Sequence, residues 1–173
     1  MELAKAAARD IAGRVEKACT GATGSARAAE IALEPTSDLA AASRGALGAD
    51  WERLSVQQRD RFSHAFKRLM RARYLGRLKR CGPLQLLVGE ASPRGAAVIV
   101  RARLEHAEGS ADELGLVLAD SGDGPRIVDV YLGDVSVMRN YRSSFRKSIR
   151  TRGFDGLMED LERAIAKATP DDR

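Results

Sequence analysis

The side chains best suited to catalysis or metal binding are few in this chain of 173 residues. The two histidines, His64 and His106, each lack a cysteine or carboxylate cluster at the spacing of metal ligands. No Ser–His–Asp order and no nucleophile elbow is present either. We therefore predict that both histidines lie at the surface, that the protein holds no metal, and that it is not an enzyme.

Asp129 is the best candidate for a functional carboxylate, because it lies inside an apolar stretch, Ile127–Leu132. A buried carboxylate there could act as a general base in a small enzyme, or could accept hydrogen bonds that join a strand to the following helix. The second interpretation is favoured. The two cysteines, Cys19 and Cys81, form no CxxC pair, and they leave a single disulfide and two thiols both open.

The charge balance favours an anionic partner. The formal net charge is +5 and the sequence pI is about 9.6, which suits nucleic acid, an anionic membrane surface or a lipid phosphate. Basic side chains are dense between Lys67 and Arg80. No helix-turn-helix, zinc or RNA-recognition motif accompanies them. A solvated helix face is therefore the simpler interpretation, and a basic nucleic-acid-binding domain is the alternative.

The elements that must position these residues follow from hydrophobic periodicity. Ser55, with Gln58 three residues later, predicts a capping box at the start of the longest helix. Period-two alternation then predicts four strands, with a hairpin turn at Ser121–Gly124. The predicted helices cover residues 2–18, 26–33, 37–47, 55–81, 136–151 and 154–167, and the strands cover 84–89, 98–104, 114–118 and 127–132.

These elements predict an α+β fold in which a curved antiparallel sheet of about four strands packs against several helices. We expect one domain, residues 1–173, with a helical N-terminal segment (1–35), helices (36–82), the sheet (83–132) and C-terminal helices (133–173). No apolar run reaches the length of a membrane span, and Met1–Lys5 does not begin a signal peptide. A cytosolic protein and a mature secreted form both fit.

Several sequence segments resemble the MlaC family, also called the toluene-tolerance auxiliary proteins. They are Leu47–Ser55 leading into Gln57–Phe62 and Phe66–Met70, then Ile127–Val130 followed by Val135–Phe145, and finally Gly153–Leu157. The resemblance covers residues 36–167 in order. It departs at Thr36–Leu39, which lacks the family's flanking Phe, at Pro125 in place of Trp, and at Asp134 in place of Gly.

This resemblance implies a nuclear-transport-factor-like cone with an interior apolar pocket. It implies a periplasmic phospholipid-binding carrier of the Mla (maintenance of lipid asymmetry) system, with phospholipid as cargo and no cofactor. Its partners would be an inner-membrane ABC transporter complex with its substrate-receiving subunit and an outer-membrane lipoprotein complex. We further expect a monomer with no nucleic-acid partner. A hopanoid or other polycyclic lipid remains an alternative cargo, and an isomerase-like enzyme on the same fold an alternative function.

The expected lipid-binding residues are the apolar stripe of the long helix, one face of the strands, and the start of the C-terminal helices. They are Phe62, Phe66, Leu69, Met70, Tyr74, Val98, Val100, Leu116, Leu118, Val128, Val130, Val137, Tyr141, Arg142 and Phe145. A guanidinium suits a lipid phosphate, because its fork donates two parallel hydrogen bonds. Arg142 could therefore hold a headgroup, or could instead pair with Asp129 or Asp134. Alternatively, the apolar stripe of the long helix and Tyr141 could belong to the hydrophobic core instead of a lipid site.

Overall fold

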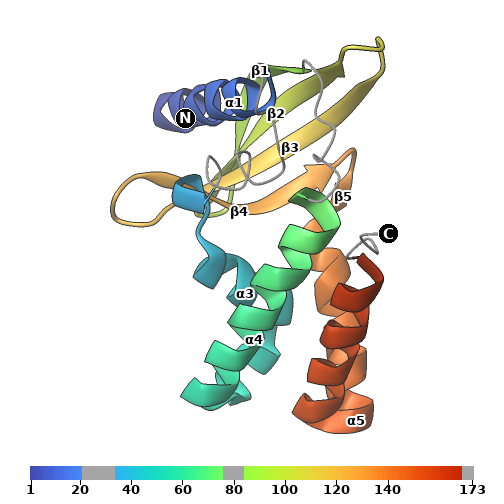
Figure 1. Ribbon diagram of the computed structural model, residues 1–173. Coiled ribbons are helices and arrows are strands. Elements are labelled where there is room, and N and C mark those ends of the chain that lie inside the picture. The colour runs from blue at the N-terminus through green and yellow to red at the C-terminus, as the bar shows by residue number, and fades with distance from the viewer. Residues whose placement is uncertain (21–33, 76–83, 169–173) are drawn as a thin grey trace.

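The computed structural model describes residues 1–20, 34–75 and 84–168. It shows an antiparallel sheet with the first helix beside it and the other helices below it in the view of Figure 1. The five strands pair in chain order, which confirms the expected α+β fold with a curved antiparallel sheet. The strands are β1 (Leu84–Arg94), β2 (Ala97–His106), β3 (Ala111–Asp120), β4 (Pro125–Leu132) and β5 (Val135–Ser136). The short β5 extends the four strands expected from the sequence.

Four α-helices and three short helical turns complete the described chain. The helices are α1 (Glu2–Thr20), α3 (Leu39–Leu47), α4 (Val56–Met70) and α5 (Val137–Ala168). The turns are η1 (Glu34–Thr36), η2 (Gly48–Arg53) and η3 (Arg71–Leu75). The helix expected over residues 26–33 and the expected helix end near Cys81 lie outside the described residues. No helix in the described ranges combines the length and apolar character needed to cross a membrane.

Local sequence signals fix where α3 and α4 begin. The Asp38 side chain accepts a hydrogen bond from the Ala41 backbone N–H at 2.9 Å, which caps α3. At the start of α4, Ser55 Oγ accepts from the Gln58 N–H at 3.2 Å, and Gln58 Oε1 accepts from the Ser55 N–H at 3.0 Å. The predicted capping box is therefore confirmed.

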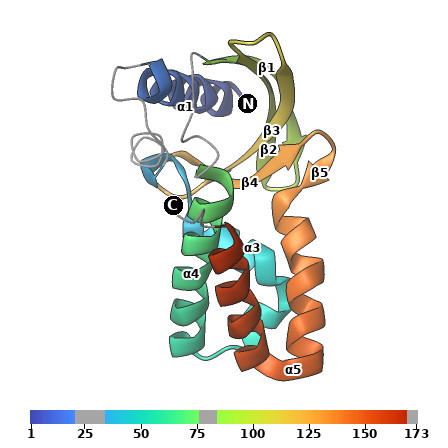
Figure 2. The same ribbon diagram turned by 45° about the vertical axis from the view of Figure 1, so that its right-hand side comes forward.

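The helices form two separate layers against the sheet (Figures 1 and 2). Helix α1 packs on the inner face near β1, and its small residues Ala4 and Ala8 let it lie close to the strands. Helices α3, α4 and α5 form a bundle that meets the sheet at β4. Each layer has its own core, here called the sheet–α1 core and the bundle core, and Val130 packs against both.

A β-bulge in β4 changes the expected alternation of that strand. Val117 pairs with Asp129 but Leu118 pairs with Ile127, so Val128 is the inserted residue. The sequence pattern placed Val128 on the same face as Val130. The structure instead packs Ile127 into the sheet–α1 core and Val128 against the outer cluster of Ile99, Val117 and Tyr131.

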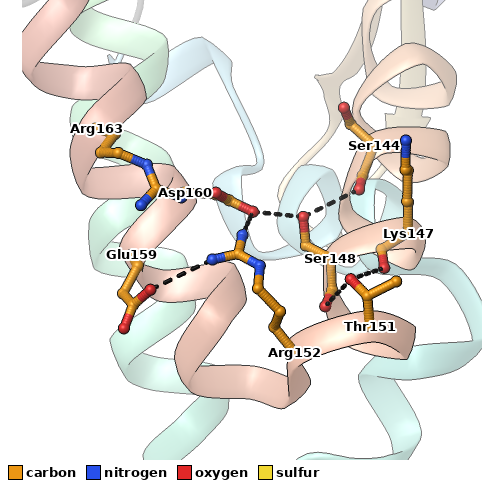
Figure 3. Close-up of polar contacts among 8 residues, drawn as sticks. All are labelled: Ser144, Lys147, Ser148, Thr151, Arg152, Glu159, Asp160 and Arg163. Carbon is orange, nitrogen blue, oxygen red and sulfur yellow. Dashed lines mark hydrogen bonds and ion pairs between the residues drawn. The ribbon is translucent and has the colours of Figure 1, made fainter.

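Gly153 divides α5 into two halves. Its φ of 70° and ψ of −169° are not helical, and this region is accessible essentially to glycine alone. The break expected at Gly153 is therefore confirmed. Figure 3 shows how the two halves are joined: Asp160 accepts a hydrogen bond from Ser148 Oγ at 2.6 Å and also contacts Arg152 and Arg163.

The Asp160 junction predicts a pH-dependent stability. The Ser148 hydroxyl, followed by Arg152 and Arg163, lowers the pKa of Asp160 from 3.8 to about 2, against the opposing effect of burial. A folded-state pKa below the unfolded value stabilises the fold above pH 3.8, and this contribution is lost as the pH falls through 2. Since the Asp160 side chain is 31% exposed, we expect Asp160→Asn to cost only about 1 kcal/mol at neutral pH.

The measurement is urea unfolding of the wild type and Asp160→Asn between neutral pH and pH 2. The difference in unfolding free energy should shrink toward zero at the acidic end. Asp155→Asn is the matched control, because Asp155 lies on the same half of α5 with an 88% exposed side chain. A constant difference for Asp160→Asn across the whole range would contradict the expectation.

Candidate functional site

An apolar pocket of about 300 Å³ lies where β4 meets the bundle. The end of α4, the start of α3 and the start of α5 close it on the helical side. Its lining residues are Glu34, Ser37, Asp38, Leu39, Ala42, Lys67, Met70, Arg71, Ile127, Val128, Asp129, Val130, Leu132, Val137 and Met138. The volume falls at the lower end of the range for small-ligand sites.

The pocket owes its shape to elements that the sequence fixes locally. The Asp38 cap sets the first turn of α3, which brings Leu39 and Ala42 to the pocket. The bulge in β4 presents several consecutive residues of the strand to it. Apolar side chains predominate in the lining, so the pocket favours an aliphatic ligand that would otherwise be exposed to water.

Charged residues lie beside this apolar surface. Lys67 forms an ion pair with Glu34, and Arg71 lies next to it along the pocket. The same lining includes the acids Glu34, Asp38 and Asp129, so charged groups of both signs border the apolar surface. The pocket therefore combines an apolar interior with charged groups beside it, an arrangement that suits a ligand with both apolar and polar parts.

Asp129 serves as a structural acceptor between β4 and α5. Its Oδ1 accepts hydrogen bonds from the backbone N–H groups of Val130 at 2.7 Å and Met138 at 3.0 Å, and its Oδ2 accepts from Ser136 Oγ at 2.6 Å. Ser136 Oγ in turn accepts from the Arg139 N–H at 2.9 Å. The carboxylate thus satisfies the first turn of α5, and this is the interpretation that the sequence favoured.

Four of the residues expected to bind lipid line the pocket together. They are Met70, Val128, Val130 and Val137. The sequence reasoning missed Leu39, Ala42 and Met138. Met138 belongs to the Val135–Phe145 segment and could have been found there, whereas nothing in the sequence distinguished Ala42 from its neighbours on α3.

The aromatic residues of the expected site lie in the bundle core. Phe62 and Phe66 are fully buried, and Leu69, Tyr141 and Phe145 are at most 7% exposed. The ring of Phe66 contacts Phe62, Tyr141 and Phe145 with centroid separations of 5.5, 5.5 and 5.9 Å. These side chains fill the interior of the bundle.

The expected strand residues lie in the sheet–α1 core. Val100, Leu116 and Leu118 are buried there, and Val98 packs against them. Helix α1 covers this face, so these residues do not line the pocket in this structure. The side chain of Tyr74 lies outside the described part of the chain.

Arg142 anchors α5 to α3. Its Nε donates to the Gly45 carbonyl at 2.8 Å, and its side chain passes so close to Gly48 that a Cβ there would be 3.0 Å from Arg142 Cδ. The acceptor is therefore neither Asp129 nor Asp134, the two acids considered from the sequence.

The remaining chemically capable residues lie away from the pocket. His64 is exposed on α4, and His106 pairs with Asp112 at 2.9 Å. Cys19 is buried in the sheet–α1 core, and Cys81 lies outside the described residues. Across residues 1–20, 34–75 and 84–168, no three His, Cys, Asp or Glu side chains gather as metal ligands would.

Two comparisons with known proteins each cover most of the chain. The family described as MlaC protein matches residues 15–163. A solved structure of the phospholipid-binding protein from Ralstonia solanacearum, in complex with a phospholipid, superposes with a TM-score of 0.79 at 18% identity. That match covers 96% of this chain and 97% of the other. No curated protein sequence matches. The structural likeness shows that the two chains share a fold.

Proposed function

This chain belongs to the MlaC family, and we propose that it is a phospholipid carrier that shelters acyl chains in the pocket between β4 and the helical bundle. The observation that carries the proposal is the apolar pocket of about 300 Å³ at the meeting point of sheet and bundle. The shared fold with a protein solved in complex with a phospholipid supports it. In this proposal residues 1–173 act as one lipid-binding domain.

The energetics require a larger cavity when lipid is bound. Each methylene removed from water is worth about 0.8 kcal/mol, so one chain of ~16 carbons represents roughly 12 kcal/mol. A pocket near the lower limit for small ligands does not enclose two such chains. The sheet–α1 core and the bundle core are separate clusters that meet at Val130. We infer that the pocket widens along this seam, where the inner face of the sheet offers Val100, Leu116 and Leu118 as further wall.

The same widening explains how a tightly held lipid is released. A carrier must bind its lipid strongly enough to offset the loss of the apolar bilayer interior, and must later release the same lipid. Release therefore requires a partner that changes the shape of the pocket. The proposed partners are an inner-membrane ABC transporter complex with its substrate-receiving subunit and an outer-membrane lipoprotein complex. The carrier would work in the periplasm as a monomer, with lipid as cargo and no cofactor.

The test is to extract the purified full chain with organic solvent and identify the lipids by mass spectrometry. We expect about one glycerophospholipid per protein. A hopanoid in its place would keep the carrier function and change the cargo. Absence of any lipid, together with a steep salt-dependent affinity for DNA or RNA, would overturn the proposal in favour of a nucleic-acid-binding domain.

A further inference from the structure

The first half of α5 carries a concentration of positive charge that the pocket does not use. Residues 137–151 contain five cations and no acid, which equals the formal net charge of the whole chain, +5. The five are Arg139, Arg142, Arg146, Lys147 and Arg150. Arg142 is half-buried and bound to the Gly45 carbonyl, whereas the other four are exposed.

These four residues, here called the basic face, lie along one side of the helix. Arg139, Arg146 and Arg150 are separated by seven and four residues, which places them on the same side of the helix. At a rise of 1.5 Å per residue this row is about 16 Å long. Lys147 lies beside the row. Figure 2 shows the first half of α5 running down one edge of the bundle from β5, and the side chains of all four residues are exposed.

The basic face is not neutralised within the described part of the protein. Arg139, Arg146, Lys147 and Arg150 form no ion pair there. By contrast, Arg152, at the end of the first half of α5, pairs with Glu159 and Asp160, and Arg163, on the second half, pairs with Asp160. Like charges four residues apart on a helix, such as Arg146 and Arg150, destabilise it. The row therefore does not serve the stability of the fold, and its charge is available to an anionic partner.

We propose that the basic face binds the anionic headgroup surface of a phospholipid bilayer. Arginine is common at protein–protein interfaces, but their cores are apolar and rich in aromatic residues. Ser143, the remaining position of the row, supplies no such core. A row of exposed cations without an apolar centre instead fits an extended anionic surface, where each Lys or Arg strengthens binding about fivefold. The inference rests on the proposed function, because a lipid cargo has to be collected from or delivered to a bilayer.

Two features next to the basic face favour a bilayer as its binding partner. Leu132 and Val135 pair across β4 and β5 and are 46% and 60% exposed, which places two apolar side chains just before α5 begins. Exposed apolar residues beside cations are typical of interfacial membrane binding. Val137 and Met138, directly before Arg139, line the pocket. The start of α5, the helix that carries the basic face, therefore forms part of the pocket wall.

The test is co-sedimentation of the full chain with vesicles of phosphatidylcholine alone and of phosphatidylcholine mixed with phosphatidylglycerol. The test variant is Arg139→Gln/Arg146→Gln/Arg150→Gln. The matched control is Arg14→Gln/Arg61→Gln/Arg103→Gln, which removes the same charge from exposed arginines on α1, α4 and β2. We expect the wild type to bind the anionic vesicles only, with binding that weakens as salt rises above about 0.15 M. The test variant should bind at least about tenfold more weakly, and the control should bind like the wild type.

Three results would overturn the inference. They are failure of the wild type to bind anionic vesicles, equal loss in the two triple variants, and unchanged binding in the test variant. Equal loss would mean that net charge alone attracts the protein, and failure of the wild type would point to an acidic protein partner. Co-purified phospholipid is measured on the same samples. Lipid present without vesicle binding contradicts this inference alone, whereas vesicle binding without co-purified lipid contradicts the proposed function and leaves the basic face supported.

Discussion

Ala42→Trp should yield a folded protein that carries at most about a tenth of the phospholipid found in the wild type. Ala42 lines the pocket from α3, opposite the β4 residues. An indole added there occupies a large share of a pocket of about 300 Å³. The bundle core behind α3 is close-packed and cannot absorb the extra volume without strain. The measurement is lipid per protein, by mass spectrometry after organic extraction.

The matched control is Ala40→Trp, because Ala40 is exposed on the same helix and outside the pocket lining. It should keep the wild-type lipid content. Thermal unfolding of both variants shows whether each one folds. A folded Ala42→Trp with its full complement of lipid would contradict the assignment of the pocket, and would place the cargo on the inner sheet face that α1 covers here.

The sequence predicts where α4 begins and where α5 breaks, because those signals are local. Ser55 and Gln58 lie three residues apart and form their capping box without help from the rest of the chain. Gly153 occupies a backbone region that other residues avoid, so the break in α5 could be predicted from one residue. Asp129 was recognisable as a strand-to-helix acceptor from its position between an apolar strand and the Val135–Phe145 segment.

The pocket could not be predicted in the same way, because it depends on which apolar faces meet. Phe62, Phe66 and Phe145 have the helical spacing of a pocket wall, but the same spacing is typical of a core, and the structure packs these rings against each other. The bulge at Val128 depends on pairing with β3 and leaves no clear signal in β4 alone. Arg142 finds its acceptor on α3, 97 residues away in the sequence.

Phe66→Ala should lower the stability of the fold strongly, because Phe66 belongs to the bundle core and not to the pocket wall. Phe66 has no exposed surface and contacts three other aromatic rings in the bundle core. Removing a buried Phe side chain leaves a cavity that the surrounding residues only partly fill, which costs about 3–5 kcal/mol. We expect this loss in the free energy of unfolding measured by urea denaturation. The lipid content per folded protein should stay near that of the wild type, because Phe66 does not line the pocket.

Leu87→Ala provides the comparison, since Leu87 is 42% exposed on β1 and its loss should change stability by less than about 0.5 kcal/mol. If Phe66 were a wall of the lipid site, as its spacing alone would allow, Phe66→Ala would enlarge the site and alter the length distribution of the bound acyl chains while costing little stability. That pattern would mean that the bundle opens around Phe66 when lipid enters. The combination expected here, a large loss of stability with unchanged cargo, instead requires the bundle core to stay closed while the seam at Val130 widens.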